Sequence, residues 1–218
     1  MTMRPSGLAL GLALAAAGCS HSPPTQFYVL APSIPASTLA EPYQGPPIRI
    51  TAVKFPPEFD RPELVDNRGS SALVVHDFAQ WAAPIGALAR QALTEDLVAR
   101  LPPGQILDDG ASSLAHRDVV VEILALRREG RATSLVLTWT LSPERPEALP
   151  AEGPGAAVTA LATEGGRPAT SRAGSEMHRL RLSEASSGSG PEDQAQVVGR
   201  LLGRTADQIA LTLAAADR

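Results

Sequence analysis

Cysteine is almost absent from this chain of 218 residues, because Cys19 is the only one. A single thiol leaves no second cysteine for a disulfide within the chain, and it cannot build a zinc site alone. Lysine is equally scarce, with Lys54 the only example, and arginine replaces it throughout, which indicates a bias of composition. The fold must therefore be stabilised by its hydrophobic core.

Long apolar runs and excess positive charge are also missing. No segment of the sequence is both long and apolar enough to cross a membrane, and only 4% of the residues are aromatic. The formal net charge of −4 argues against nucleic acid as a partner and against a basic surface for lipid headgroups. Apolar residues at 44% nevertheless indicate a globular protein with enough chain for one real core.

Patterns of catalysis and metal binding are not found either. The four histidines are scattered along the chain, at His21, His76, His116 and His178. Their spacing matches no metal-ligand motif, and the sequence has neither a nucleophile elbow nor a phosphate-binding glycine loop. The adjacent carboxylates Glu95-Asp96 and Asp108-Asp109 are typical of solvated surfaces. We predict a protein that is not an enzyme and that uses no cofactor or metal.

The N-terminal segment has the composition of a bacterial secretory signal. Arg4 precedes a mostly apolar run over residues 7–17, which as a helix would span about 16 Å against a hydrocarbon core of about 30 Å. Small residues then lead to Gly18-Cys19, as in a lipoprotein signal. In such signals the cysteine thiol is acylated with fatty acids such as palmitate. Ala16 departs from the leucine common at that position, and the alternative is an ordinary signal with an incidental cysteine. We predict that residues 1–18 are removed and that Cys19 is the lipidation site.

Residues 19–25 are predicted to be a lipidated tether ahead of a domain over residues 26–218. The six residues between Cys19 and Gln26 reach about 20 Å when extended, which keeps the domain near its membrane. Two acyl chains anchor stably where one would not. Ser20 rather than aspartate follows the cysteine, and the sorting rule of enterobacterial lipoproteins then favours the outer membrane, with the domain facing the periplasm.

Alternating and β-branched runs predict about half a dozen strands, mostly joined as hairpins. The runs cover residues 26–30, 48–53, 59–66, 71–75, 119–124, 134–141 and 176–182. Hairpin-turn chemistry occurs at Asn67-Arg68-Gly69 and Glu129-Gly130-Arg131. From Pro143 to Arg172 the chain is rich in proline, glycine and alanine, and we expect an irregular insertion.

Two amphipathic helices are predicted. The first has Asp77 as its N-cap, a kink or restart at Pro84, and then a stretch from Ile85 to Leu101. Its apolar stripe consists of Phe78, Trp81, Ile85, Leu88 and Ala92. The second helix begins near Pro191 and carries an apolar stripe up to Leu213.

Hairpins followed by amphipathic helices indicate an α+β fold. We expect a single two-layer domain in which a mostly antiparallel sheet carries both helices on one face. Trp81 and Trp139 lie on apolar stripes and are predicted to be core residues. The stripe around Trp81 is expected to pack against the central sheet.

Three short stretches follow the predicted lipidation site: Phe27-Tyr28-Val29-Leu30, Phe59-Asp60-Arg61-Pro62-Glu63-Leu64-Val65 and Phe78-Ala79-Gln80-Trp81-Ala82-Ala83-Pro84-Ile85. In this order and spacing they resemble the ABC-type transport auxiliary lipoproteins, the family of paraquat-inducible protein C. Each stretch alone is a weak motif, whereas the ordered set is specific, and the resemblance covers most of the mature chain. The family's motif positions fall on Tyr28, Leu30, Arg61, Pro62, Trp81 and Pro84.

These motif positions have a structural character. On the predicted strand, Arg61 would bind local carboxylates or carbonyls, and Trp81 would fill the seam between sheet and helix. The chain departs from the family where Ile85 replaces the usual leucine and where the insertion from Pro143 to Arg172 is longer.

The resemblance implies a lipoprotein subunit of an MCE-type lipid transport system between the inner and outer membranes. Its partners would be an MCE-domain protein and inner-membrane transporter components, which it would bind by docking, and a homo-oligomeric ring would match their symmetry. Two other functions stay open at this point. One is a periplasmic lipid carrier, which requires a large apolar cavity, and the other is a structural or assembly lipoprotein without a transport link.

Overall fold

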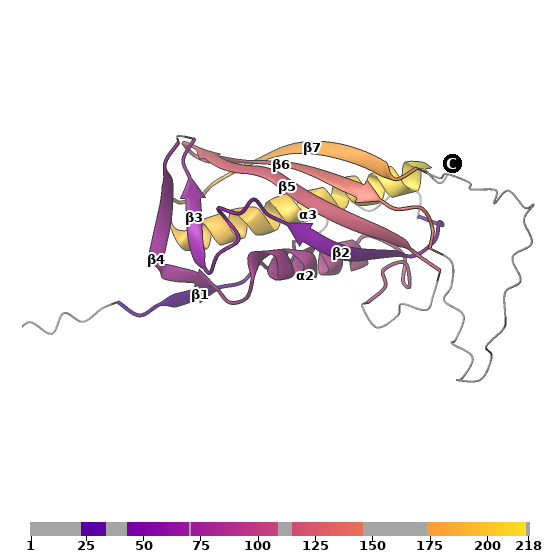
Figure 1. Ribbon diagram of the computed structural model, residues 1–218, viewed down its shortest axis with the longest axis horizontal. Coiled ribbons are helices and arrows are strands. Elements are labelled where there is room, and N and C mark those ends of the chain that lie inside the picture. The colour runs from indigo at the N-terminus through magenta and orange to yellow at the C-terminus, as the bar shows by residue number, and fades with distance from the viewer. Residues whose placement is uncertain (1–22, 34–42, 70, 109–114, 146–173, 217–218) are drawn as a thin grey trace, which may run out of the picture.

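The computed structural model describes residues 23–33, 43–69, 71–108, 115–145 and 174–216 (Figure 1). Cys19, the first residues of the predicted tether and most of the predicted insertion from Pro143 to Arg172 lie outside these ranges. Within the described residues, the chain forms two helices and seven strands. No helix among them is long and apolar enough to cross a membrane.

A three-stranded sheet forms one end of the elongated domain (Figure 1). It consists of β1 (Gln26–Tyr28), β3 (Glu63–Asn67) and β4 (Leu73–Trp81), in the order β1-β4-β3. β3 and β4 pair antiparallel as a hairpin, whereas β1 pairs parallel with β4. The parallel pairing brings the N-terminal motif against the end of β4, because Tyr28 lies opposite Trp81.

A four-stranded sheet makes up the rest of the β structure. It consists of β2 (Ile48–Lys54), β5 (Arg117–Glu129), β6 (Ala132–Leu141) and β7 (Glu176–Ala185), in the order β2-β5-β6-β7. β2 pairs parallel with β5, and the other two pairs are antiparallel. The tight turn from β5 to β6 uses Gly130 at φ 60°, a conformation that glycine adopts without steric cost.

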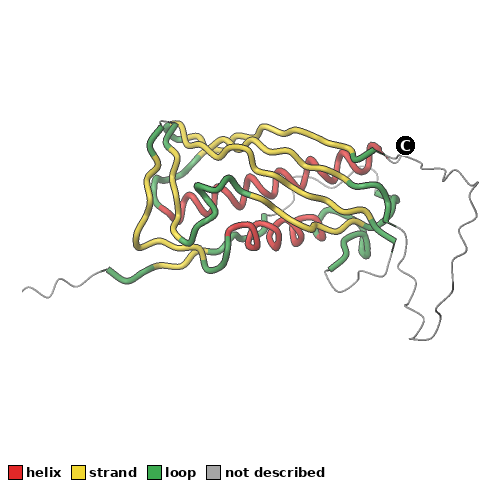
Figure 2. The backbone as a smooth tube through the Cα atoms, viewed as in Figure 1, coloured by secondary structure: helices red, strands yellow, loops and turns green. Residues whose placement is uncertain are grey.

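Both helices lie on one face of the four-stranded sheet, which arches over α3 (Figure 2). They are α2 (Ile85–Val98) and α3 (Pro191–Ala216). Alternate residues of the central strands point at the helices and are fully buried, for example Val121 on β5 and Leu137 on β6. The predicted α+β fold with helices on one face is thus confirmed, and the strands divide into two sheets where the sequence had suggested one.

The first helix begins later than predicted, because residues 77–81 belong to a strand. Phe78 is 47% exposed and Trp81 only 5%, so neighbouring side chains alternate across β4 with a period of two. The expectation that Asp77 caps a helix, with Phe78 buried on its stripe, is wrong. Pairing with β1 and β3 decides the conformation here, and the helix begins directly after Pro84.

Other element boundaries differ by a few residues. β3 begins at Glu63 and not at Phe59, because residues 56–60 form turns in which Phe59 N donates to Pro56 O at 2.9 Å. β4 and β5 are longer than their sequence runs, and α2 ends at Val98 instead of Leu101. Strand ends depend on pairing partners, which lie far away in the sequence.

The segment after β1 crosses α3 in close contact. A Cβ atom added at Gly199 would lie 2.9 Å from Ala31 O, and one added at Gly203 would overlap Ser33 Oγ. Two glycines one helical turn apart therefore make a shallow channel for residues 31–33. This crossing holds the N-terminal segment against the body of the domain.

Candidate functional site

The motif stretches, far apart in the sequence, meet at the three-stranded sheet. Backbone hydrogen bonds join them: Trp81 N donates to Pro62 O at 2.7 Å, and Ala82 N donates to Tyr28 O at 2.8 Å. Pro84, near the end of the third stretch, is the N-cap of α2, and its carbonyl accepts from Ala87 N at 2.9 Å. The sequence motifs are thus parts of one structural junction.

This junction surrounds a small pocket at the protein surface, here called the motif pocket. Its volume is about 270 Å³, and it is lined by Asp60, Arg61, Pro62, Trp81, Ala83 and Pro84. Trp81 is buried in its wall, while Ala83 and Pro84 are exposed at its rim. The lining includes four of the six motif positions that were named from the sequence, namely Arg61, Pro62, Trp81 and Pro84.

The other two motif positions support the junction from beside the pocket. Tyr28 is half-buried, and its hydroxyl donates to Gln26 Oε1 at 2.6 Å. Leu30 is buried in the hydrophobic core. The pocket therefore presents the second and third motifs to solvent, and the first motif lies behind them.

Arg61 supplies the positive charge of the motif pocket. Its side chain is 44% exposed, and its Nε lies 2.8 Å from Glu63 Oε2. The hydrogen bond from Arg61 lowers the pKa of Glu63 below its usual value, so the carboxylate is charged at neutral pH. The residue lies in the turn before β3 and not on a strand as predicted, but it does bind a local carboxylate.

An open groove runs between β1 and α3 on the same end of the molecule. Its volume is about 720 Å³, and its lining includes Phe27, Val29 and Pro32 on one side and Ala195 and Arg200 on the other. Phe27 is 66% exposed and Val29 59%. The sequence places Phe27 and Val29 in the same motif as Tyr28 and Leu30. Strand alternation is the signal that could have separated the exposed pair from the more buried pair.

A buried ionic cluster that the sequence did not reveal connects the N-terminal segment with both helices. Asp96 accepts a hydrogen bond from Ser33 N at 2.7 Å, and Arg100 contacts Asp96 at 3.3 Å and Asp207 at 2.6 Å. Burial raises the pKa of Asp96, and the hydrogen bonds and charges of Ser33 and Arg100 only partly oppose this effect. Glu95-Asp96 had been interpreted as a solvated helix face, which is wrong for Asp96, since it is completely buried.

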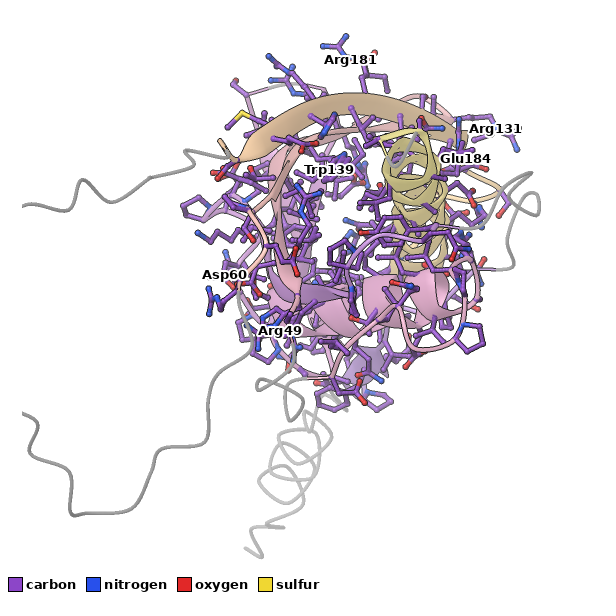
Figure 3. The ribbon with its side chains drawn as sticks, turned by 90° about the vertical axis from the view of Figure 1, so that its right-hand side faces the viewer. Arg49, Asp60, Arg131, Trp139, Arg181 and Glu184 are labelled. Atoms are coloured by element: carbon purple, nitrogen blue, oxygen red, sulfur yellow. The ribbon has the colours of Figure 1, made fainter. Side chains whose placement is uncertain are left out.

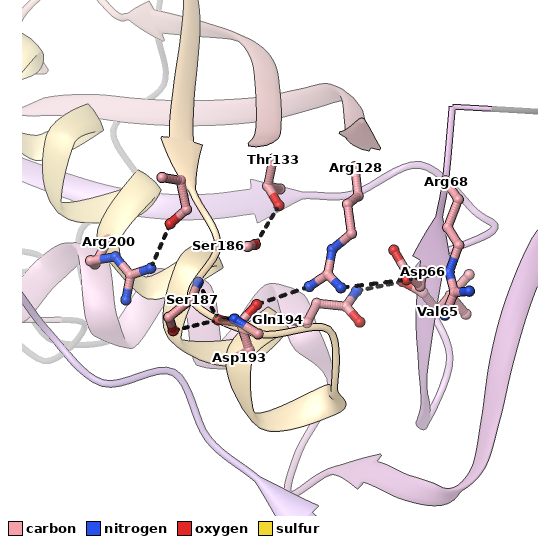
Figure 4. Close-up of polar contacts among 12 residues, drawn as sticks. Val65, Asp66, Arg68, Arg128, Thr133, Ser186, Ser187, Asp193, Gln194 and Arg200 are labelled. Atoms are coloured by element: carbon pink, nitrogen blue, oxygen red, sulfur yellow. Dashed lines mark hydrogen bonds and ion pairs between the residues drawn. The ribbon is translucent and has the colours of Figure 1, made fainter. Parts of the chain in front are cut away.

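A second polar cluster joins the two sheets to the start of α3 (Figure 4). Arg128 on β5 lies 3.1 Å from Asp193 and 3.8 Å from Asp66 on β3. Burial by itself would raise the pKa of Asp193, but hydrogen bonds from Ser187, Gly188 and Ser186 outweigh it, and the net effect is a lowered pKa. Gln194 also donates to Val65 O at 2.6 Å. These contacts hold the small sheet in place.

Among the residues that the structure describes, no group of three or more His, Cys, Asp or Glu side chains is placed to hold a metal. Trp139, labelled in Figure 3, is 1% exposed, as predicted for a core residue. Its ring stacks on that of His178 with a centroid separation of 4.2 Å. The lining of the motif pocket combines the charged side chains of Asp60 and Arg61 with apolar ones from Pro62, Trp81, Ala83 and Pro84.

Comparisons with known proteins agree with the motif order. A family model described as "ABC-type transport auxiliary lipoprotein component" matches residues 28–210. No curated protein matches the chain.

Two crystal structures share the fold. One is of an uncharacterized protein, with a TM-score of 0.57, 13% sequence identity, and coverage of 86% of this chain and 97% of the other. The second is of a DUF330 protein from Xanthomonas campestris, with a TM-score of 0.57, 12% identity, and coverage of 86% and 95%. At such identities the likeness concerns the fold alone.

Proposed function

The chain belongs to the family of ABC-type transport auxiliary lipoprotein components, and from this premise we propose that it serves an MCE-type lipid transport system. In this proposal the protein is anchored in the outer membrane, faces the periplasm and docks an MCE-domain protein that connects to inner-membrane transporter components. Membership of a transport family points to a binding subunit rather than an enzyme. The protein would perform no covalent chemistry.

The main observation in favour of a docking role is that the family motifs converge on one surface pocket. Residues from the second and third stretches line the motif pocket, and the first stretch pairs with its wall, where Tyr28 lies opposite Trp81. Structural motifs would be expected to lie wholly inside the core, yet Arg61 is 44% exposed and Ala83 and Pro84 are exposed. A family signature that reaches solvent at one place supports a shared partner at that place.

The tether supports a docking role at the membrane. The domain begins at Gln26, so an acylated Cys19 would keep it within about 20 Å of the bilayer. A domain held that closely cannot carry cargo across the periplasm alone. A partner would have to reach it from the inner membrane.

Partner capture tests the docking role. A soluble form beginning at Ser20 is expected to retain the periplasmic part of the MCE partner in a pull-down, without added lipid or metal. The Arg61→Ala variant should lose at least about tenfold in affinity, as expected when an interface charge is removed. Arg181→Ala is the matched control, because Arg181 is exposed on the other sheet and points outward (Figure 3).

Equal capture by the Arg61→Ala and Arg181→Ala variants would exclude the motif pocket as the docking site. Organic extraction of the soluble form separates docking from lipid carriage. Recovery of one lipid per chain, with no partner captured, would favour the carrier function.

The lipid anchor has its own test. The Cys19→Ala variant is expected to accumulate as an unprocessed precursor that incorporates no labelled palmitate and is lost from the outer-membrane fraction. A variant that still incorporates palmitate and fractionates with the outer membrane would show that Cys19 is not the attachment point.

A further inference from the structure

Three exposed apolar side chains lie together where the tether enters the domain, and they are here called the apolar rim: Phe27, Val29 and Phe78. Their exposed fractions are 66%, 59% and 47%. Phe27 lies on β1, Val29 directly follows the last residue of that strand, and both side chains line the groove beside α3. In the parallel register Phe27 lies opposite Gln80, so Phe78, two residues earlier on β4, belongs to the same face.

The described end of the tether lies beside this rim. Pro23 and Pro24 line a shallow pocket together with Phe78 and Pro191, the first residue of α3. Only residues 20–22 separate Pro23 from Cys19, so an acylated Cys19 would be at most about 14 Å from Pro23. The rim is therefore the part of the domain closest to the anchor.

Charge near the rim favours an apolar contact over an electrostatic one. The groove beside Phe27 and Val29 contains Arg200 and Arg204 together with acidic side chains. Both arginines are paired with Glu184, at 3.6 Å and 3.1 Å. The lining also contains Glu192 and Asp207, so its acidic side chains outnumber these two arginines and the groove has no excess of positive charge to attract anionic headgroups.

We propose that the apolar rim rests in the headgroup and acyl boundary of the bilayer that holds the lipid anchor. The rim would then fix the orientation of the domain. The three-stranded sheet would face the membrane, and the start of β7 near Glu176 would point away from it. Exposed phenylalanine side chains partition into this boundary region, and the anchor makes the encounter intramolecular. The proposal rests on the lipid attachment at Cys19 but not on partner docking.

Tryptophan fluorescence can test this orientation, because both native tryptophans are shielded. Trp81 is 5% exposed and Trp139 1%. A tryptophan placed on the surface therefore reports on its own surroundings. The mature acylated protein is reconstituted into vesicles of phosphatidylethanolamine and phosphatidylcholine with brominated acyl chains, which quench tryptophan on contact.

The variants Phe27→Trp and Val29→Trp are expected to show about a twofold loss of the added emission, because the rim is immersed in the boundary region. Met177→Trp is the matched control. Met177 is 71% exposed near the start of β7, at the opposite end of the domain (Figure 1). The added emission of this variant should stay unquenched. Two rim positions are tested so that the proposal can still be judged if one of the two variants fails to fold.

Each alternative result overturns the proposal. Equal quenching at position 177 and at the rim would mean that the domain has no fixed orientation, and no quenching at positions 27 and 29 would place the rim outside the bilayer. Quenching that requires anionic lipid would replace the apolar contact by an electrostatic one. Failure of the mature protein to enter vesicles would remove the anchor and with it the proposal, whereas partner capture by the soluble form would be unaffected.

Discussion

The four-stranded sheet buries its inner side chains beneath two helices, whereas the three-stranded sheet leaves large apolar side chains in solvent. Leu137 and Val121 in the larger sheet are fully buried, while Phe27 and Phe78 in the smaller sheet are about half exposed or more. The smaller sheet contains the family motifs. The larger sheet thus contributes most of the buried core, and the smaller sheet is the region in which we propose contacts with other molecules.

The two regions are also joined by different forces. Apolar packing dominates between the larger sheet and the helices, and polar contacts attach the smaller sheet through Asp66, Arg128 and Gln194. Polar contacts require defined geometry, so they position the smaller sheet as well as hold it. The comparison teaches that the smaller sheet is held both by buried side chains such as Leu64 and Trp81 and by polar contacts of defined geometry, while its outer face stays exposed.

The largest expected effect comes from the core of the larger sheet. Trp139→Ala should lower the free energy of unfolding by about 3–5 kcal/mol, because a fully buried aromatic side chain leaves a cavity. Trp81→Ala is expected to cost a similar amount, since Trp81 is also buried. Chemical denaturation measures both. Wild-type stability of Trp81→Ala with lost partner binding would instead assign Trp81 to the interface.

The buried cluster of Asp96 and Arg100 should give the next effect. Arg100→Met leaves the carboxylate of Asp96 without its counter-charge and should cost about 3 kcal/mol at pH 7. The variant is expected to raise the pKa of Asp96 further, and a raised pKa means that stability is lost as pH rises through it. The difference from wild type should therefore shrink as the pH falls toward the ordinary range of aspartate. A difference that does not change with pH would contradict this account.

The cluster at Asp193 differs from that at Asp96 in the direction of the pKa shift, because folding lowers the pKa of Asp193. Asp193→Asn is expected to cost about 1–3 kcal/mol at pH 7, because hydrogen bonds to a charged group are lost. The pKa of Asp193 is lowered in the folded protein, so its stabilisation is present above the ordinary aspartate pKa and is lost as the pH falls through the folded value. Thermal unfolding at several acidic pH values measures it, and a cost that persists below pH of about 2 would exclude this cause.

The smallest effect is expected at the apolar rim. Replacing both Phe27 and Val29 by serine should change the free energy of unfolding by no more than about 0.5 kcal/mol, because exposed side chains lose little apolar contact. Denaturant titration of the soluble form measures it. A loss as large as that of Trp139→Ala would show that the rim is part of the core, and the contrast between the two sheets would fail.

Sequence patterns predicted much of the larger region correctly. The hairpin of β5 and β6, the buried position of Trp139 and the start of α3 near Pro191 follow from alternation, turn residues and helical periodicity, all of which are local. The same patterns misled at residues 77–81, where apolar spacing fits a helix and a strand equally well. Pairing with β3 and with β1, whose residues lie 53 positions before their partners in β4, decided the outcome.

The candidate site divides in the same way. The motif residues could be named from their order along the chain, but their convergence on one pocket could not, because the parallel pairing of β1 with β4 is a long-range contact. The ionic cluster of Ser33, Asp96 and Arg100 was equally hidden, since a charged residue on a helix gives no local sign of burial. Burial depends on which segments pack on top.

By itself, the sequence determined the α+β class, the family and most strands and helices, because period and turn chemistry act between near neighbours. Only the tertiary structure decided that the strands divide into two sheets, that the motif pocket opens to solvent and that Phe27 and Val29 are exposed. These features arise from contacts between distant segments. Their energies depend on which side chains exclude water together, and that property belongs to the folded chain as a whole.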